Sequence, residues 1–169
     1  DYYAAVASTS FYQDYPDAHS DKPIPTYLIN GEGNGKDDTG TPYDDRWNRT
    51  DDWAQYFLRV NGFVYTPAVY AADGTVTTFG VPVSEPVFTV TGPYDRFETY
   101  TWINGQDIPL VQYTNSLYRP HNCLTSETPM LWDFLEHYRV DTNDDGTVTR
   151  YYSASAFERD DQVLIQFGA

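Results

Sequence analysis

The chain has 169 residues, of which 40% are hydrophobic and 17% aromatic, a composition that fits one folded domain and excludes a disordered segment. Its formal net charge of −15 makes nucleic acids and anionic membranes poor partners. Cys123 is the single cysteine, which excludes an internal disulfide framework and a cysteine-based zinc site. The acidic, lysine-poor and tyrosine-rich composition indicates a secreted protein. No cofactor is expected, and no apolar run approaches the roughly 20 residues that a membrane span needs.

The N-terminal third contains two strand patterns separated by a polar, proline-containing loop. Residues 3–8 (YAAVAS) are a short apolar segment that suits a buried strand, already under way where the chain starts. Residues 26–29 (TYLI) are the strongest strand signal in this third. This second strand leads directly into a glycine- and aspartate-rich loop at residues 30–42.

Residues 50–61 are predicted to form a helix. Thr50 is a suitable N-cap, the apolar side chains that follow have helical spacing, and Asn61-Gly62 is a typical left-handed stop. From Phe63 to Val111 the pattern changes to short alternating strands. Turn signals at Asp73-Gly74, Gly92-Pro93 and Asn104-Gly105 separate those strands and predict a β-meander.

A buried strand is expected at residues 108–113, followed by a loop that carries His121 after Pro120. Thr128 as N-cap and Pro129 at the first position then predict a helix. Its apolar face is formed by Met130, Leu131, Phe134, Leu135 and Tyr138. A histidine between a buried strand and a helix lies where open α/β sheets place their chemistry. A local packing role for His121 is the alternative.

The last part of the chain reads as a hairpin with its tip at residues 141–148, followed by a short strand at residues 163–167. Asp141 to Gly146 match the first half of an EF-hand loop, but Tyr152 stands where the bidentate glutamate is needed. A plain hairpin turn is therefore favoured over a calcium site. The alternation of strands and helices predicts a single α/β domain with a mostly parallel sheet, crossover helices, and a meander and hairpin insertion.

The order of these segments resembles the C-terminal half of secreted α/β-hydrolase esterases, the polyhydroxybutyrate depolymerase and feruloyl esterase type. The resemblance covers roughly residues 1–140. Residues 2–7 (YYAAVA) look like the strand after the nucleophile helix, and residues 24–34 (IPTYLINGEGN) look like the strand and loop that supply the catalytic acid. Asp51-Asp52-Trp53 through Asn61-Gly62 look like the next helix. Pro120-His121 and Leu131-Trp132-Asp133-Phe134 are similar to the histidine loop and the helix behind it.

By this resemblance His121 is the triad histidine of a serine-type carboxylic ester hydrolase. The family's acid position falls on Asn34, and an amide cannot orient and charge a histidine as a carboxylate does. Asp38 is the favoured substitute, then Asp37, with Glu32 as a third possibility on the same loop. An acidic, solvated surface loop is the alternative interpretation.

No Gly-x-Ser-x-Gly occurs in these residues, so the nucleophile is expected from an N-terminal half of the fold, on the same precursor or on a separate chain. The expected partners are that half and an ester substrate. A second hypothesis is a catalytically inactive, hydrolase-like secreted protein used for binding or extracellular assembly. A third, resting on the loop at residues 141–146, is a calcium-stabilised binding module.

Overall fold

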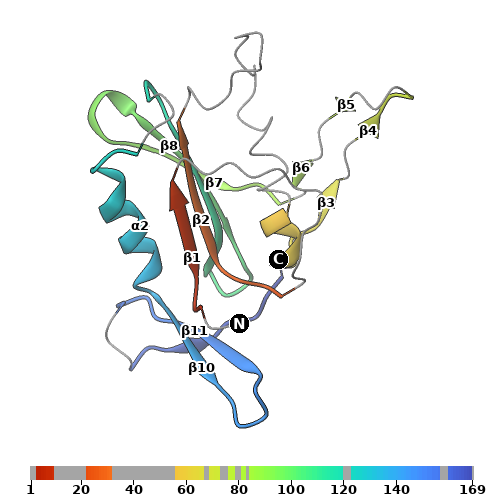
Figure 1. Ribbon diagram of the computed structural model, residues 1–169, viewed down its shortest axis with the longest axis vertical. Coiled ribbons are helices and arrows are strands. Elements are labelled where there is room, and N and C mark those ends of the chain that lie inside the picture. Colours follow the sequence, from red (N-terminus) through yellow and green to blue (C-terminus); the bar gives the residue numbers. More distant parts are fainter. Residues whose placement is uncertain are drawn as a thin grey trace.

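The protein is described from a computed structural model. It describes residues 3–9, 22–31, 56–66, 69–72, 76–78, 81–82, 84–119, 123–156 and 160–168. The main element is a five-stranded sheet in the order β1-β2-β9-β8-β7 (Figure 1). Its strands are β1 (Val6–Thr9), β2 (Thr26–Gly31), β9 (Pro109–Ser116), β8 (Phe97–Ile103) and β7 (Val87–Thr91).

One half of this sheet is parallel. β1 pairs with β2 from Val6 opposite Thr26, and β2 pairs with β9 from Thr26 opposite Val111. β2 is buried along almost its whole length, as expected for a central parallel strand rich in aliphatic residues. The predicted strands at residues 3–8, 26–29 and 108–113 are thus confirmed, with ends that differ by a few residues.

The other half is antiparallel. β7, β8 and β9 follow each other as a meander, with β7–β8 and β8–β9 both antiparallel. Gly92 in the first turn has φ 83° and Asn104-Gly105 forms the second turn, so two of the predicted turn signals are confirmed. The α/β class is confirmed, but the prediction of a mostly parallel sheet was wrong. The meander is not an insertion beside the sheet, because β7, β8 and β9 are three of the sheet's own strands.

Helix α2 (Glu127–Leu135) packs against β1 and β2, and it begins two residues before the predicted start. Ser126 rather than Thr128 is the N-cap, and its side chain makes no capping hydrogen bond. The backbone N–H of Leu124 instead donates to Glu127 Oε2 at 3.2 Å, so the Glu127 carboxylate satisfies the chain entering the helix. The helix ends before Tyr138, which opens the next strand.

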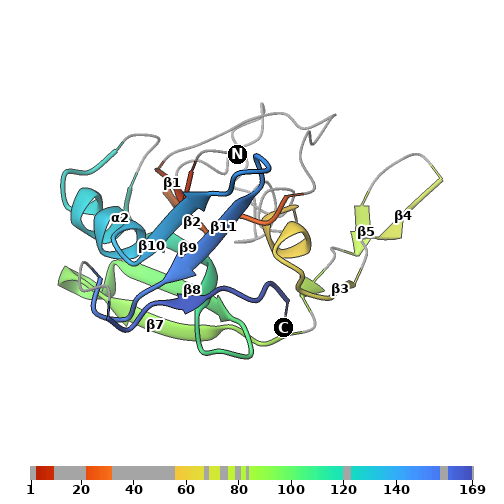
Figure 2. The same cartoon turned by 90° about the horizontal axis from the view of Figure 1, so that it is seen from below.

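The C-terminal part forms a small antiparallel sheet of β10 (Tyr138–Thr142), β11 (Val148–Tyr152) and β12 (Val163–Leu164), below the main sheet in Figure 1. The predicted hairpin is confirmed. The Asn104 side chain connects this part to the β8–β9 turn, because its amide donates to Gln166 O at 2.7 Å. In the view from below, this small sheet crosses the ends of the main strands (Figure 2).

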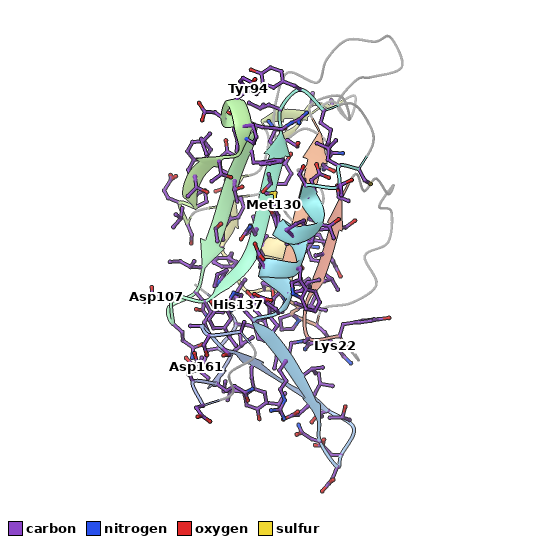
Figure 3. All side chains as sticks on the ribbon, turned by 90° about the vertical axis from the view of Figure 1, so that its left-hand side faces the viewer. Lys22, Tyr94, Asp107, Met130, His137 and Asp161 are labelled. Atoms are coloured by element: carbon purple, nitrogen blue, oxygen red, sulfur yellow. The ribbon has the colours of Figure 1, made fainter. Side chains whose placement is uncertain are left out.

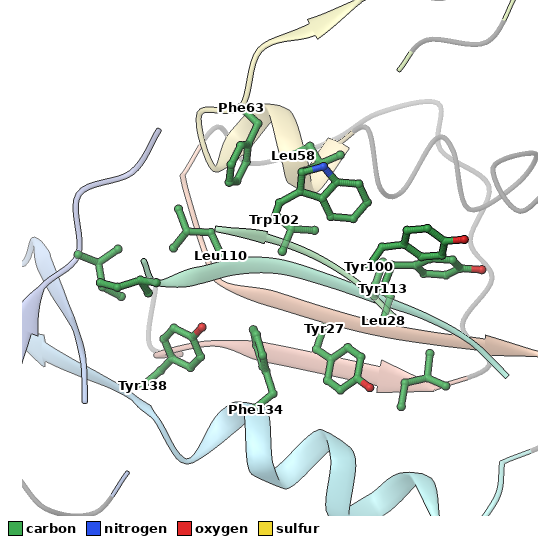
Figure 4. Packing of buried hydrophobic residues seen from close by; sticks show 14 residues of the cluster. Tyr27, Leu28, Leu58, Phe63, Tyr100, Trp102, Leu110, Tyr113, Phe134 and Tyr138 are labelled. Carbon is green, nitrogen blue, oxygen red and sulfur yellow. The ribbon is translucent and has the colours of Figure 1, made fainter. Parts of the chain in front are cut away.

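The core lies on both faces of the main sheet (Figure 4). Tyr27 faces α2, where its ring lies 5.5 Å from that of Phe134. On the opposite face Trp102 packs with Leu58 and Phe63 around the helical segment at residues 56–60. The end of the helix predicted at residues 50–61 is confirmed, since Gly62 has φ 87°, whereas its beginning lies outside the described residues.

Two short ladders complete the described elements. β3 (Tyr65–Thr66) pairs with β6 (Val81–Pro82), and β4 (Val69–Tyr70) pairs with β5 (Val76–Thr78), both antiparallel. The predicted turn at Asp73-Gly74 falls outside the described residues.

Candidate functional site at the carboxyl edge of the sheet

The three parallel strands end at one edge of the main sheet. β1 ends at Thr9, β2 at Gly31 and β9 at Ser116, and Gly31 lies opposite Ser116 in the register. We call this set of strand ends, Thr9, Gly31 and Ser116, the carboxyl edge. In open α/β sheets this is the edge at which side chains for binding and catalysis gather.

A buried ion pair lies beside the carboxyl edge. Arg119 Nε is 2.8 Å from Glu127 Oε1, and both side chains are fully buried. Burial lowers the pKa of the Arg119 guanidinium, and the charge of Glu127 opposes that change. Since each charge is shielded from water, each depends on the other for compensation. The pair also joins the two ends of the chain segment that contains residues 120–126.

The Glu127 carboxylate extends this network to the first strand. Thr9 Oγ1, at the end of β1, donates to Glu127 Oε2 at 2.5 Å. One carboxylate therefore contacts the end of β1, the backbone of Leu124 just before α2, and Arg119, three residues past the end of β9. A single buried glutamate in this way determines how three elements meet at the carboxyl edge.

Gly31 is in close contact with the same arginine. A Cβ atom at Gly31 would lie 2.7 Å from Arg119 O and 3.0 Å from its Nε, closer than a side chain tolerates. Arg119 Nη2 also donates to Ile29 O at 3.4 Å, a long hydrogen bond. The ends of β2 and of the β9 segment are therefore packed directly against each other.

The residues predicted for catalysis lie in the two segments of the chain that follow Gly31 and Arg119, the residues that meet at this contact. Asp37 and Asp38, with Glu32 and Asn34, follow Gly31 within residues 32–55, and His121 follows Arg119 within residues 120–122. Both segments lie outside the described residues. The described residues bring together the points from which the two segments depart, and the distances among His121, Asp37 and Asp38 stay predictions.

A second group of serine, histidine and aspartate is present near the C-terminus, but its connections differ from those of a catalytic triad. His137 Nδ1 is 2.7 Å from the backbone oxygen of Ser153, not from its hydroxyl. The Ser153 hydroxyl donates instead to Asp161 Oδ1. The Ser153 hydroxyl is thus held by the carboxylate of Asp161, while the imidazole contacts the backbone oxygen of the serine, an arrangement that differs from the serine–histidine–carboxylate order of a catalytic triad.

The hairpin tip uses its polar side chains within the turn. Asp145 Oδ1 accepts hydrogen bonds from the backbone and the hydroxyl of Thr147, and these hydrogen bonds lower the pKa of Asp145. Asn143 donates to Thr147 and Thr149. This is the hairpin turn that the sequence favoured. Among the described residues, no group of three or more His, Cys, Asp or Glu side chains is arranged to hold a metal ion.

Sequence reasoning did not find Arg119, Glu127 or Thr9. Opposite charges on either side of the histidine loop were a visible signal, but their burial depends on how β1, β9 and α2 pack. No family model, curated protein or solved structure matches the chain. Within the part of the chain that the structure describes, no helix has the length and apolar character needed to cross a membrane.

Proposed function

We propose that this chain supplies the general base and the acid of a serine-type carboxylic ester hydrolase, with His121 as base and Asp38, or failing it Asp37, as acid. The observation that carries the proposal is the contact between Gly31 and Arg119. Because β2 and β9 are parallel neighbours, the segments bearing the acid and the histidine leave from adjacent positions on one edge. A base and the carboxylate that orients it need this kind of adjacency.

The proposed reaction begins with a serine hydroxyl supplied from outside these residues, by a preceding segment or a separate chain. Its oxygen attacks the ester carbonyl carbon while His121 accepts the hydroxyl proton. His121 then returns the proton to the departing alkoxide, which leaves an acyl-enzyme. Water hydrolyses the acyl group with His121 as base again. The carboxylate of Asp38 would hold the imidazole in the required tautomer and stabilise its charged form.

The ion pair of Arg119 and Glu127 would support this chemistry without taking part in it. Arg119 precedes His121 by two residues, and Glu127 begins the helix on the other side of the loop. The pair therefore closes the histidine loop at its base and limits where His121 can lie. Fixing the two ends of the histidine loop in this way favours catalysis, because small displacements of a general base reduce the rate steeply.

The test is hydrolysis of p-nitrophenyl acetate and p-nitrophenyl butyrate by the assembled protein that contains this chain. His121→Ala is expected to lower turnover by as much as about 10⁶-fold, and Asp38→Asn by as much as about 10⁴-fold. If Asp37 is the acid, Asp37→Asn takes the larger loss instead. Asp144→Asn, an exposed change at the hairpin tip, is the matched control and should leave turnover unchanged.

Turnover that is unchanged in His121→Ala would overturn the proposal. Loss in His121→Ala without loss in Asp37→Asn or Asp38→Asn would move the acid to Glu32, which Glu32→Gln then tests. An assembled protein that hydrolyses neither ester would favour the second hypothesis, a hydrolase-like protein used for binding. The observation in favour of that hypothesis is Asn34 at the family's acid position together with the lack of a Gly-x-Ser-x-Gly.

A further inference from the structure

A groove of about 350 Å³ lies between α2 and the antiparallel half of the main sheet, away from the contact of Gly31 with Arg119. It forms because α2 packs on β1 and β2, and no described helix covers the same face of β8 and β7. Figure 3 looks onto this side of the molecule, with Met130 on α2, the helix that borders the groove, and His137 just beyond the end of that helix. Its volume is at the lower end of the range of about 300–1,000 Å³ typical of small-molecule sites.

One wall of the groove is a set of hydroxyl side chains at alternate strand positions. Thr89 and Thr91 on β7 and Thr99 and Thr101 on β8 all line it, and Gln112 on β9 adds an amide. Thr99 lies opposite Thr89 and Thr114 in the register. On a β-sheet such side chains recur about 6.8 Å apart along a strand and about 4.8 Å apart between strands. The result is a regular array of groups that both donate and accept hydrogen bonds.

The inner end of this array is fixed by hydrogen bonds. The Tyr27 hydroxyl is 2.8 Å from Thr114 Oγ1, which is 2.7 Å from Thr99 Oγ1, and all three residues are buried. A hydroxyl can donate one hydrogen bond and accept two, so the Thr99 hydroxyl at the outer end of this row can form a further hydrogen bond. Thr89 and Thr91 are exposed beyond it. The groove therefore has an ordered floor and an accessible rim.

The other wall comes from one face of α2 and from the small sheet. Met130, Asp133 and Phe134 on α2 line the groove at helical spacing, and His137, two residues past the end of the helix, continues this wall. His137 Nδ1 contacts a carbonyl oxygen, which only accepts, so Nδ1 carries the proton and neutral His137 keeps Nε2 as an acceptor.

Aromatic rings close the same end of the groove. The Tyr138 ring lies 4.9 Å from that of Phe134, and the Tyr152 ring lies 5.4 Å from those of His137 and Tyr138. The Tyr138 hydroxyl donates to Pro109 O, which keeps this ring in place. Aromatic surfaces of this kind bind the apolar faces of a ligand, while their polar ends remain hydrogen-bonded.

The charge of the lining residues selects the ligand. None of the described residues that line the groove is Lys or Arg, and one of them, Asp133, has a carboxylate. The chain as a whole has a net charge of −15. An anionic ligand is therefore disfavoured. A wall of hydroxyls and an amide, facing a wall of aromatic rings, suits a molecule with hydroxyls around its edge and C–H groups on its faces. A pyranose or furanose sugar has this form.

We propose that this groove is a binding site for a neutral saccharide. The ring edge would contact Thr89, Thr101 and Gln112, one ring face would pack against Tyr138 and Tyr152, and Asp133 would accept hydrogen bonds from sugar hydroxyls. This inference does not depend on the proposed ester hydrolysis, since it uses neither His121 nor the carboxyl edge. It holds equally for a catalytic protein and for a binding protein.

The experiment titrates the ¹⁵N-labelled chain with glucose, galactose, mannose, xylose, N-acetylglucosamine and cellobiose, and follows backbone amides by NMR. At least one sugar is expected to shift the amides of Thr89, Thr101 and Gln112, while those of the β10–β11 turn stay in place. The double variant Thr89→Val/Thr101→Val keeps the side-chain shape and removes two hydroxyls. It should weaken binding about tenfold or more.

Thr128→Val is the matched control, because Thr128 is exposed on α2 and is not part of the groove. Its affinity should equal that of the unchanged protein. Asp133→Ala, a change at an exposed residue, provides a second loss of affinity in case the double variant folds poorly. No shift with any of these sugars would overturn the proposal, as would equal affinity in the groove variants and the control. Binding of putrescine at the same amides without sugar binding would make this an amine site and overturn it too.

Discussion

The parallel and antiparallel halves of the main sheet differ in chemistry on one and the same face. On β2 this face carries Tyr27 and Ile29, both fully buried beneath α2. Three strands further on, β7 presents Thr89 and Thr91, both exposed. The same sheet thus forms a dry interface where a helix covers it and a hydroxylated surface where no described helix does. The difference shows that the polarity and exposure of the side chains on this face follow their position relative to α2.

The largest effect on stability is expected from the ion pair of Arg119 and Glu127, in the half of the sheet that α2 covers. Glu127→Ala should lower the free energy of unfolding by about 3–5 kcal/mol, because it removes the carboxylate that is ion-paired with the buried Arg119 guanidinium. Glu98→Ala on β8, where the carboxylate accepts from Asn115 at 3.3 Å and is only half-buried, should cost less than about 1 kcal/mol. Urea unfolding measures both changes.

The double change Arg119→Met/Glu127→Met separates charge from packing. It removes both charges together, so much of the stability lost in Glu127→Ala should return. Equal losses in Glu127→Ala and Glu98→Ala would show that the two halves of the sheet do not differ in this respect.

A pair of glycine substitutions gives a smaller contrast. Gly31→Ala should lower stability by about 1–3 kcal/mol, since its Cβ would meet the backbone oxygen of Arg119 at 2.7 Å. Gly105→Ala, in the β8–β9 turn, has nothing within 4 Å of its Cβ and should change stability little. Thermal unfolding of the two variants measures the difference. A Gly31→Ala protein as stable as the Gly105→Ala protein would contradict the close contact at the carboxyl edge.

Alkaline pH should lower the stability of the protein, because two tyrosine hydroxyls are buried next to α2. Burial raises the pKa of Tyr27, and burial together with the charge of Tyr152 raises the pKa of Tyr138 well above its ordinary value. Unfolded tyrosine ionises near pH about 10, so stability is fully present below that pH and falls as pH rises from there towards the folded pKa.

Unfolding midpoints between pH about 9 and about 11 measure this slope. Tyr138→Phe should flatten it, because one of the raised groups is gone. Tyr94→Phe changes a side chain that is 92% exposed and should leave the slope as it was. A slope that is the same in both variants would contradict the role of Tyr138.

The fold was predictable in its elements and less so in their assembly. The strands around Thr26 and Val111 and the turn at Gly92 follow from local patterns, since apolar runs and glycines with positive φ are local properties. The mixed sheet was missed because pairing direction depends on how distant segments meet. The start of α2 was missed because Glu127, not a serine or threonine, satisfies the chain at that point, and its burial is visible only in three dimensions.

The candidate sites show the same division. His121 was predicted from residue type and order and stays a prediction, whereas the ion pair of Arg119 and Glu127 depends on packing that no local pattern indicates. The groove had a visible signal in the alternating threonines of residues 89–91 and 99–101. That alternation predicted strands, but which face α2 would leave uncovered could not be read from it.

The pairing of β2 with β9 has a consequence for how the molecule folds. Tyr27 and Thr114, which share a hydrogen bond across this pair, are 87 residues apart in sequence. Joining them costs the entropy of closing a long loop, whereas β7, β8 and β9 are joined by short turns. We therefore expect the meander to form early in folding and to act as the template on which β2 and then β1 assemble. Mutations in the β8–β9 turn should then slow folding more than mutations in β1, which should mainly speed unfolding.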